Sequence, residues 1–137
     1  MNEGWLGEDY LILFSDLEVA SETDRYRLVE WLPDFAIVGL RGWDDFIVRA
    51  TDGVTYTIPT VPLDKRYLTP FDIPTNTSLK RDDRYNGQIK WHVTPLVFGG
   101  DAMAEDNTIW IGSEQHAAAV AWWNALYIEL NGSEGRS

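Results

Sequence analysis

The sequence predicts an α+β domain: an antiparallel sheet of about five to six short strands, packed by one short helix and one long C-terminal helix. Three short apolar runs between residues 35 and 58 have the length and alternation typical of strands. The Asp52-Gly53 pair between the last two runs is typical of a hairpin turn, since glycine adopts a positive φ at little cost. A single apolar stripe at helical spacing, from His116 to Leu130, predicts the long helix.

The first predicted strand is the apolar run at residues 10–14. Ser15 and Glu18 follow it with the spacing of a capping box, in which each side chain hydrogen-bonds the other residue's backbone N–H. This spacing predicts a short acidic helix from Asp16 to about Asp24. After Pro33, runs at 35–39, 46–50 and 54–58 predict a three-stranded antiparallel meander with a tight reversal at 40–45.

Residues 59–88 do not fit a continuous regular element, because they contain four prolines and an Asn-Gly pair. Two further strands are expected at 93–98 and 108–111, and Ser113 is expected to cap the C-terminal helix. Asn131-Gly132 is a helix stop signal. We therefore expect a single domain over residues 1–132 and a frayed tail over 133–137.

The net charge of the chain limits the classes of partner that it can bind. Its 137 residues carry 22 acidic and 11 basic side chains, a net charge of −11. The acidity is uneven, since residues 1–64 hold 13 acids against 4 arginines, or −9, and the rest of the chain carries −2. A field of this sign repels nucleic acid and anionic membranes and favours basic partners. We expect no nucleic-acid and no membrane partner.

Catalytic and metal-binding patterns are scarce. The chain has no cysteine and two histidines, so thiol chemistry and thiolate metal sites are excluded. His116 falls on the apolar helix stripe, as expected of a packed side chain, and His92 is interpreted as structural or surface. The acidic loop at 101–107 does not match a calcium-binding loop. We expect no metal, no cofactor and no enzymatic activity.

What remains is a binding surface. Trp43 lies at a predicted turn between Arg41 and the pair Asp44-Asp45, and an aromatic side chain flanked by charge suits a protein-interface anchor. Trp43 could equally fold over the sheet edge as core. Trp122 lies about 100° around the helix from Trp123, so it either widens the buried face or contacts another subunit. The candidate partner-binding residues are therefore Arg41, Trp43, Asp44, Asp45 and Trp122.

Residues 7–64 resemble the SUKH superfamily, named in part for fungal regulators of the Smi and Knr type. The resembling features are the run at 10–14 leading into the acidic helix, the segment at 26–33, the strand at 35–39, and a hairpin that ends in the segment at 56–64. The segment at 107–111, His116 and Trp122-Trp123-Asn124 also look like the tail of longer bacterial members. The chain departs from the family by beginning at the strand that follows the usual N-terminal helices, and by having Leu40-Arg41-Gly42-Trp43 at a turn that is commonly glycine-rich.

The resemblance implies an immunity protein that binds and neutralises a bacterial toxin delivered by contact-dependent or type VI secretion. An acidic chain agrees with this, because toxins that cut nucleic acid tend to be basic. The alternative is an assembly module that forms a homo-oligomer, such as a homodimer through Trp122 and the final helix, without a toxin partner. The N-terminus lacks a basic start followed by an apolar run, so we expect a cytoplasmic protein.

Overall fold

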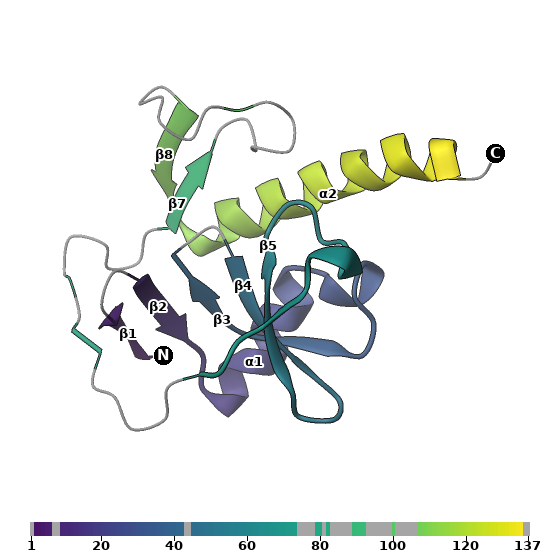
Figure 1. The fold of residues 1–137 in the computed structure, drawn as a ribbon. Coiled ribbons are helices and arrows are strands. Elements are labelled where there is room, and N and C mark those ends of the chain that lie inside the picture. Colours follow the sequence, from purple (N-terminus) through teal and green to yellow (C-terminus); the bar gives the residue numbers. More distant parts are fainter. Residues whose placement is uncertain are drawn as a thin grey trace.

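The computed structural model describes residues 2–6, 9–42, 45–73, 79–80, 82, 89–92, 100 and 107–135. It has the predicted α+β architecture, with two α-helices and an antiparallel sheet (Figure 1). The elements in chain order are β1 (Asn2–Leu6), β2 (Asp9–Leu13), α1 (Asp16–Arg25), η1 (Leu28–Glu30), β3 (Phe35–Arg41), β4 (Asp45–Ala50), β5 (Thr55–Pro59), η2 (Lys65–Tyr67), β6 (Thr69–Pro70), β7 (Ile89–His92), β8 (Thr108–Ile111) and α2 (Ser113–Gly135). None of the described helices is long and apolar enough to cross a membrane.

Strands β1 to β6 form one sheet in sequential order, and β7 and β8 form a separate hairpin. Each pair in the large sheet is antiparallel, so the meander of β3, β4 and β5 is confirmed. The β4–β5 connection contains Gly53 with φ 89°, as the Asp-Gly signal predicts. Helix α1 begins with the predicted capping box, in which Ser15 accepts from Glu18 N–H and Glu18 accepts from Ser15 N–H.

Several elements differ from the sequence predictions. Strand β1 was not predicted, because Asn2, Glu3 and Gly4 are weak strand formers. Its pairing with β2 stabilises it, together with a buried hydrogen bond of 2.6 Å that the Tyr10 hydroxyl donates to Glu3 Oε2. The hairpin partner of β8 is β7, and the strand expected at 93–98 lies outside the described residues.

The stop predicted for the C-terminal helix at Asn131-Gly132 is wrong, since α2 continues to Gly135. A glycine inside a helix costs about 1 kcal/mol, which further backbone hydrogen bonds can offset. The expected fraying of the tail stays a prediction.

The apolar core lies on both faces of the large sheet, because neighbouring residues of a strand point to opposite sides. One face carries Tyr10, Ile12, Leu40, Phe46 and Val48, which pack with side chains from α2 and β7. The other face carries a smaller cluster, in which Leu11, Val38 and Ile47 pack with Val19 of α1 and with Phe71. Figure 1 shows α2 crossing the end of the sheet and continuing past it toward the C-terminus.

Candidate functional site

The N-terminal half of α2 is fixed to the core by His116, which is fully buried. Its Nδ1 shares a hydrogen bond of 2.6 Å with the Tyr26 hydroxyl. The rings of Tyr26, Phe46 and Trp91 meet the imidazole edge to face, with centroids 5.2 to 6.4 Å away. Burial lowers the pKa of His116 to about 3. His116 is therefore neutral at physiological pH and structural, as the sequence suggested.

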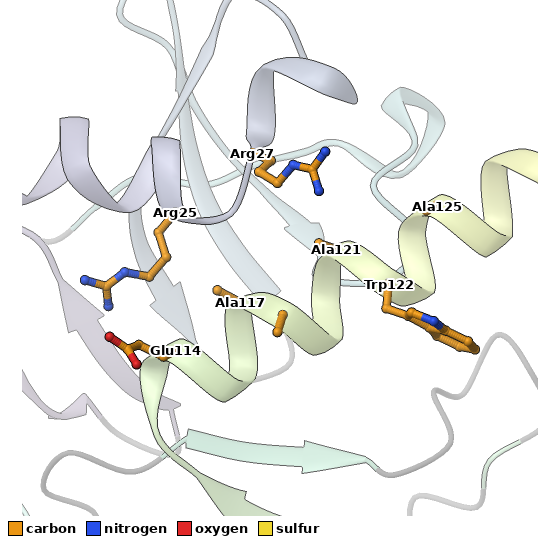
Figure 2. A pocket seen from close by; sticks show the side chains of 8 residues that line it. Arg25, Arg27, Glu114, Ala117, Ala121, Trp122 and Ala125 are labelled. Atoms are coloured by element: carbon orange, nitrogen blue, oxygen red, sulfur yellow. The ribbon is translucent and has the colours of Figure 1, made fainter.

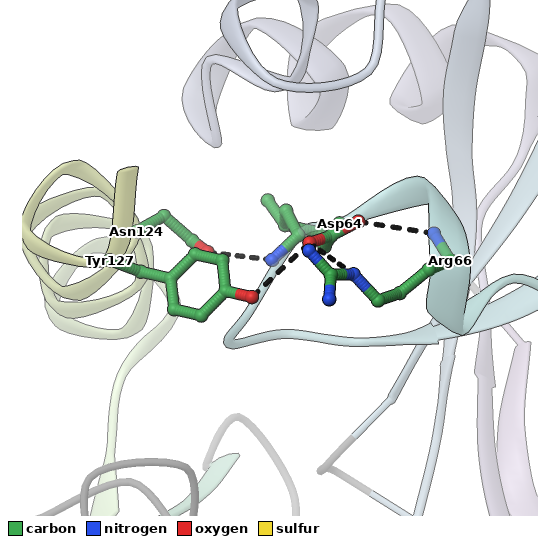
Figure 3. Close-up of polar contacts among 5 residues, drawn as sticks. Asp64, Arg66, Asn124 and Tyr127 are labelled. Carbon is green, nitrogen blue, oxygen red and sulfur yellow. Dashed lines mark hydrogen bonds and ion pairs between the residues drawn. The ribbon is translucent and has the colours of Figure 1, made fainter. Parts of the chain in front are cut away.

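The middle of α2 is fixed by Asn124, which the helical stripe did not include. Asn124 is buried; its Oδ1 accepts from Leu63 N–H at 2.7 Å, and its Nδ2 donates to the carbonyls of Thr60 and Val120. One turn later, the Tyr127 hydroxyl donates to Asp64 Oδ2 at 3.2 Å (Figure 3). Asp64 also pairs with Arg66 of η2 at 2.9 Å, so the Tyr127–Asp64 hydrogen bond joins α2 to the start of η2. These bonds hold one side of α2 rigidly against the sheet domain.

The opposite side of α2 lines an open groove of about 630 Å³, whose other wall is formed by the end of α1 and the residue before η1. Figure 2 shows Arg25 and Arg27 along one wall and the alanines of α2 along the other, whereas the Trp122 ring points away from the two arginines. Trp122 is 61% exposed, and its ring meets that of Trp123 edge to face at 4.8 Å. The groove is lined by Arg25, Arg27, Glu114, Ala117, Ala118, Ala121, Trp122 and Ala125. Trp122 therefore does not widen the buried face of α2.

The arginine wall follows from a backbone turn. Arg27 has φ 56°, in the left-handed region that residues other than glycine enter at a cost, and this turn separates α1 from η1. Arg27 pairs with Glu30 at 2.8 Å and Arg25 with Glu22 at 3.3 Å. Burial raises the pKa of Glu22, and the neighbouring Arg25 guanidinium opposes this rise. The groove thus has two arginines and one glutamate in its lining, on a chain with a net charge of −11.

The β3–β4 turn is the second candidate surface, and the structure describes Arg41, Gly42 and Asp45 there. The Arg41 guanidinium lies over the Phe71 ring, 5.1 Å from its centroid, and Arg41 and Asp45 are opposite each other in the strand register. Trp43 and Asp44, the other two residues predicted for this turn, lie outside the described residues.

The predicted binding residues that the structure describes, Arg41, Asp45 and Trp122, fall on two separate surfaces. Phe71, beneath Arg41, packs with the cluster on one face of the sheet, whereas α2 packs against the cluster on the other face. Arg41 and Trp122 therefore do not share one contact surface. Arg25 and Arg27 were not predicted as site residues, because the groove depends on α1 meeting α2 across about ninety positions of sequence. The positive φ of Arg27 left no signal in the sequence.

Metal ligands do not cluster in the described parts of the chain: no group of three His, Asp or Glu side chains is placed to hold an ion there. The acidic loop at 101–106 lies outside the described residues, as does the side chain of His92.

Comparisons with protein-family models, with curated proteins and with solved structures find no match to this chain.

Proposed function

We propose that this chain is a non-catalytic immunity protein that acts in the cytoplasm, binding a cognate bacterial toxin and neutralising it by covering the toxin's active site. The observation that carries the proposal is the concentration of acid in residues 1–64, which hold 13 acids against 4 arginines. Asp16, Asp24, Glu30, Asp34 and Asp52 of this part are exposed. A surface of this charge accelerates association with a basic protein and disfavours other partners.

The β3–β4 turn is the contact that we assign to the toxin. Strands β3 and β4 are buried along most of their length, so the turn rests on a rigid base. The Phe71 ring supports Arg41 on one side of this turn, and Asp45 follows on the other strand. With Trp43 and Asp44 between them in sequence, the turn combines an aromatic anchor with acids that suit a basic partner. The resemblance of residues 7–64 to SUKH immunity proteins supports the same function.

Two charge reversals, one at each end of β4, test this assignment. Asp45 begins β4, and Asp52 follows its other end, so Asp45→Lys and Asp52→Lys change the net charge equally at opposite ends of the sheet. The binding partner is obtained by affinity capture from the native host's lysate at low salt. We expect Asp45→Lys to slow its association by about 3- to 10-fold, with a flatter salt dependence, and Asp52→Lys to slow it much less.

If both reversals slowed association equally, the β3–β4 turn would not be the contact site, and the attraction would come from the charge of the whole surface. Unchanged association in both variants would contradict the charge argument itself. Asp52 Oδ1 accepts from Val54 N–H at 3.0 Å, so urea unfolding of both variants checks that each remains folded.

A homo-oligomeric assembly module is the second candidate function. The exposure of Trp122 in the α2 groove favours it. Since α2 and the Arg41 side chain lie on opposite faces of the sheet, self-association through α2 and toxin binding at the β3–β4 turn are compatible.

A further inference from the structure

Helix α2 has an apolar stripe on the side that faces away from the core. Ala118, Ala121, Ala125 and Ile128 are spaced by three, four and three residues, the spacing of a seam along which two helices pack. Ala118, Ala125 and Ile128 are exposed, with Ile128 at 45%. A helix that is apolar on two sides is normally covered on both. The rest of the protein covers only one of these two sides of α2.

The same helix extends beyond the rest of the fold. Figure 1 shows its C-terminal half continuing past the sheet, and Ile128 and Leu130 are exposed there. The N-terminal half, by contrast, forms one wall of the groove with Arg25 and Arg27. The chain thus has both an open groove that can take a helix and a projecting helix with a matching apolar stripe.

We propose that a second copy of this chain occupies the groove, with the two α2 helices packed antiparallel about a two-fold axis. The seam then closes on itself: Ala121 of one copy lies opposite Ala125 of the other, and Ala118 lies opposite Ile128. The small side chains at the centre allow the helix axes to approach at the short end of the usual range of about 8 to 10 Å. Such a contact is isologous and therefore stops at a dimer.

The charges of the groove favour this direction of packing. Arg25 lies beside Glu114 at the start of α2 (Figure 2). Antiparallel packing brings Glu129 of the second copy to this end of the groove, where the guanidinium of Arg25 attracts it. Parallel packing would instead place the two Glu129 side chains near each other. The antiparallel pair also opposes the helix dipoles favourably.

The dimer gives a geometry to the second candidate function, the homo-oligomer, but it does not depend on the immunity function, and the salt dependence of binding separates the dimer from toxin binding. Each copy carries a net charge of −11, so the copies repel at low salt and screening should strengthen the dimer. Binding of a basic toxin should weaken with salt.

Sedimentation of the full chain at low and moderate salt, with a matched pair of variants, tests the dimer. Ala125→Glu puts a charge in the seam, and Ala20→Glu makes the same change on the exposed side of α1. Glutamate is a good helix former, so both variants should fold, and circular dichroism checks this. We expect the parent and Ala20→Glu to dimerise, more tightly at moderate salt, and Ala125→Glu to dissociate at least about tenfold more readily.

A disulfide experiment tests the direction, because the natural chain has no cysteine. Mixing Ala121→Cys protein with Ala125→Cys protein under mild oxidation should give covalent heterodimers, whereas either protein alone should give few. Efficient cross-linking of each protein alone would show parallel packing and overturn the proposal. A parent chain that stays monomeric at all concentrations and both salts would also overturn it. If the parent chain is monomeric and Ala125→Glu abolishes its binding of another protein from the lysate, a helix of that other protein occupies the groove instead of a second copy.

Discussion

The buried His116 makes stability depend on pH in a way that tests how α2 is held. In the folded chain its pKa lies near 3, because burial disfavours the charged imidazole, against an ordinary value of 6.5. Between these values the unfolded chain binds a proton that the folded chain does not. The free energy of unfolding therefore falls as the pH drops below 6.5, by up to about 1.4 kcal/mol per pH unit. From pH 6.5 to 4.5 the loss is roughly 2 to 3 kcal/mol, out of about 5 to 15 kcal/mol for a typical domain.

The assay is urea unfolding, followed by tryptophan fluorescence, of the parent and of His116→Gln between pH 7 and 4.5. Glutamine keeps a polar partner for the Tyr26 hydroxyl but does not titrate in this range. The buried carboxyl of Glu22, whose raised pKa gives the opposite slope, titrates in both proteins and cancels in their difference. We expect the parent to lose its advantage over His116→Gln steadily as the pH falls. Parallel stability curves for the two proteins would refute the buried, neutral histidine.

Two further substitutions test the packing around the site by the same unfolding assay. Asn124→Leu keeps the size of the side chain but removes its hydrogen bonds to residues 60–63, which leaves buried backbone groups unpaired. We expect the free energy of unfolding to fall by about 2 to 4 kcal/mol. An unchanged free energy of unfolding would show that these hydrogen bonds do not hold α2. Gly39→Ala would press a Cβ against the Ile12 carbonyl oxygen and should cost about 1 to 3 kcal/mol. Gly112→Ala is its control, because a Cβ there meets open space; equal losses in the two alanine variants would contradict the close approach of β2 and β3.

Local signals in the sequence predicted much of the fold. The capping box at Ser15 and Glu18 depends on four consecutive residues and was found as expected. The meander and the strand at 108–111 follow from short apolar runs. Strand β1 could not be predicted in this way, because the pairing with β2 stabilises it more than its own residues do.

The candidate site was harder to predict from the sequence, because its residues meet only through tertiary packing. His116 was correctly interpreted as core, since an apolar stripe surrounds it. Asn124 was missed, because a buried amide needs partners that only the 60–63 segment supplies. The pattern singled out Trp122, but the other wall of the groove comes from distant parts of the sequence, with Arg25 at the end of α1 and Arg27 just before η1.

The most direct test of the proposed function is a growth assay with the captured partner. The partner is expressed from an inducible promoter in a laboratory host, alone or together with this chain. We predict that the partner alone arrests growth, that co-expression of the parent chain restores it, and that Asp45→Lys restores it less well than Asp52→Lys. A partner that is harmless alone, or equally toxic with and without this chain, would contradict the immunity function.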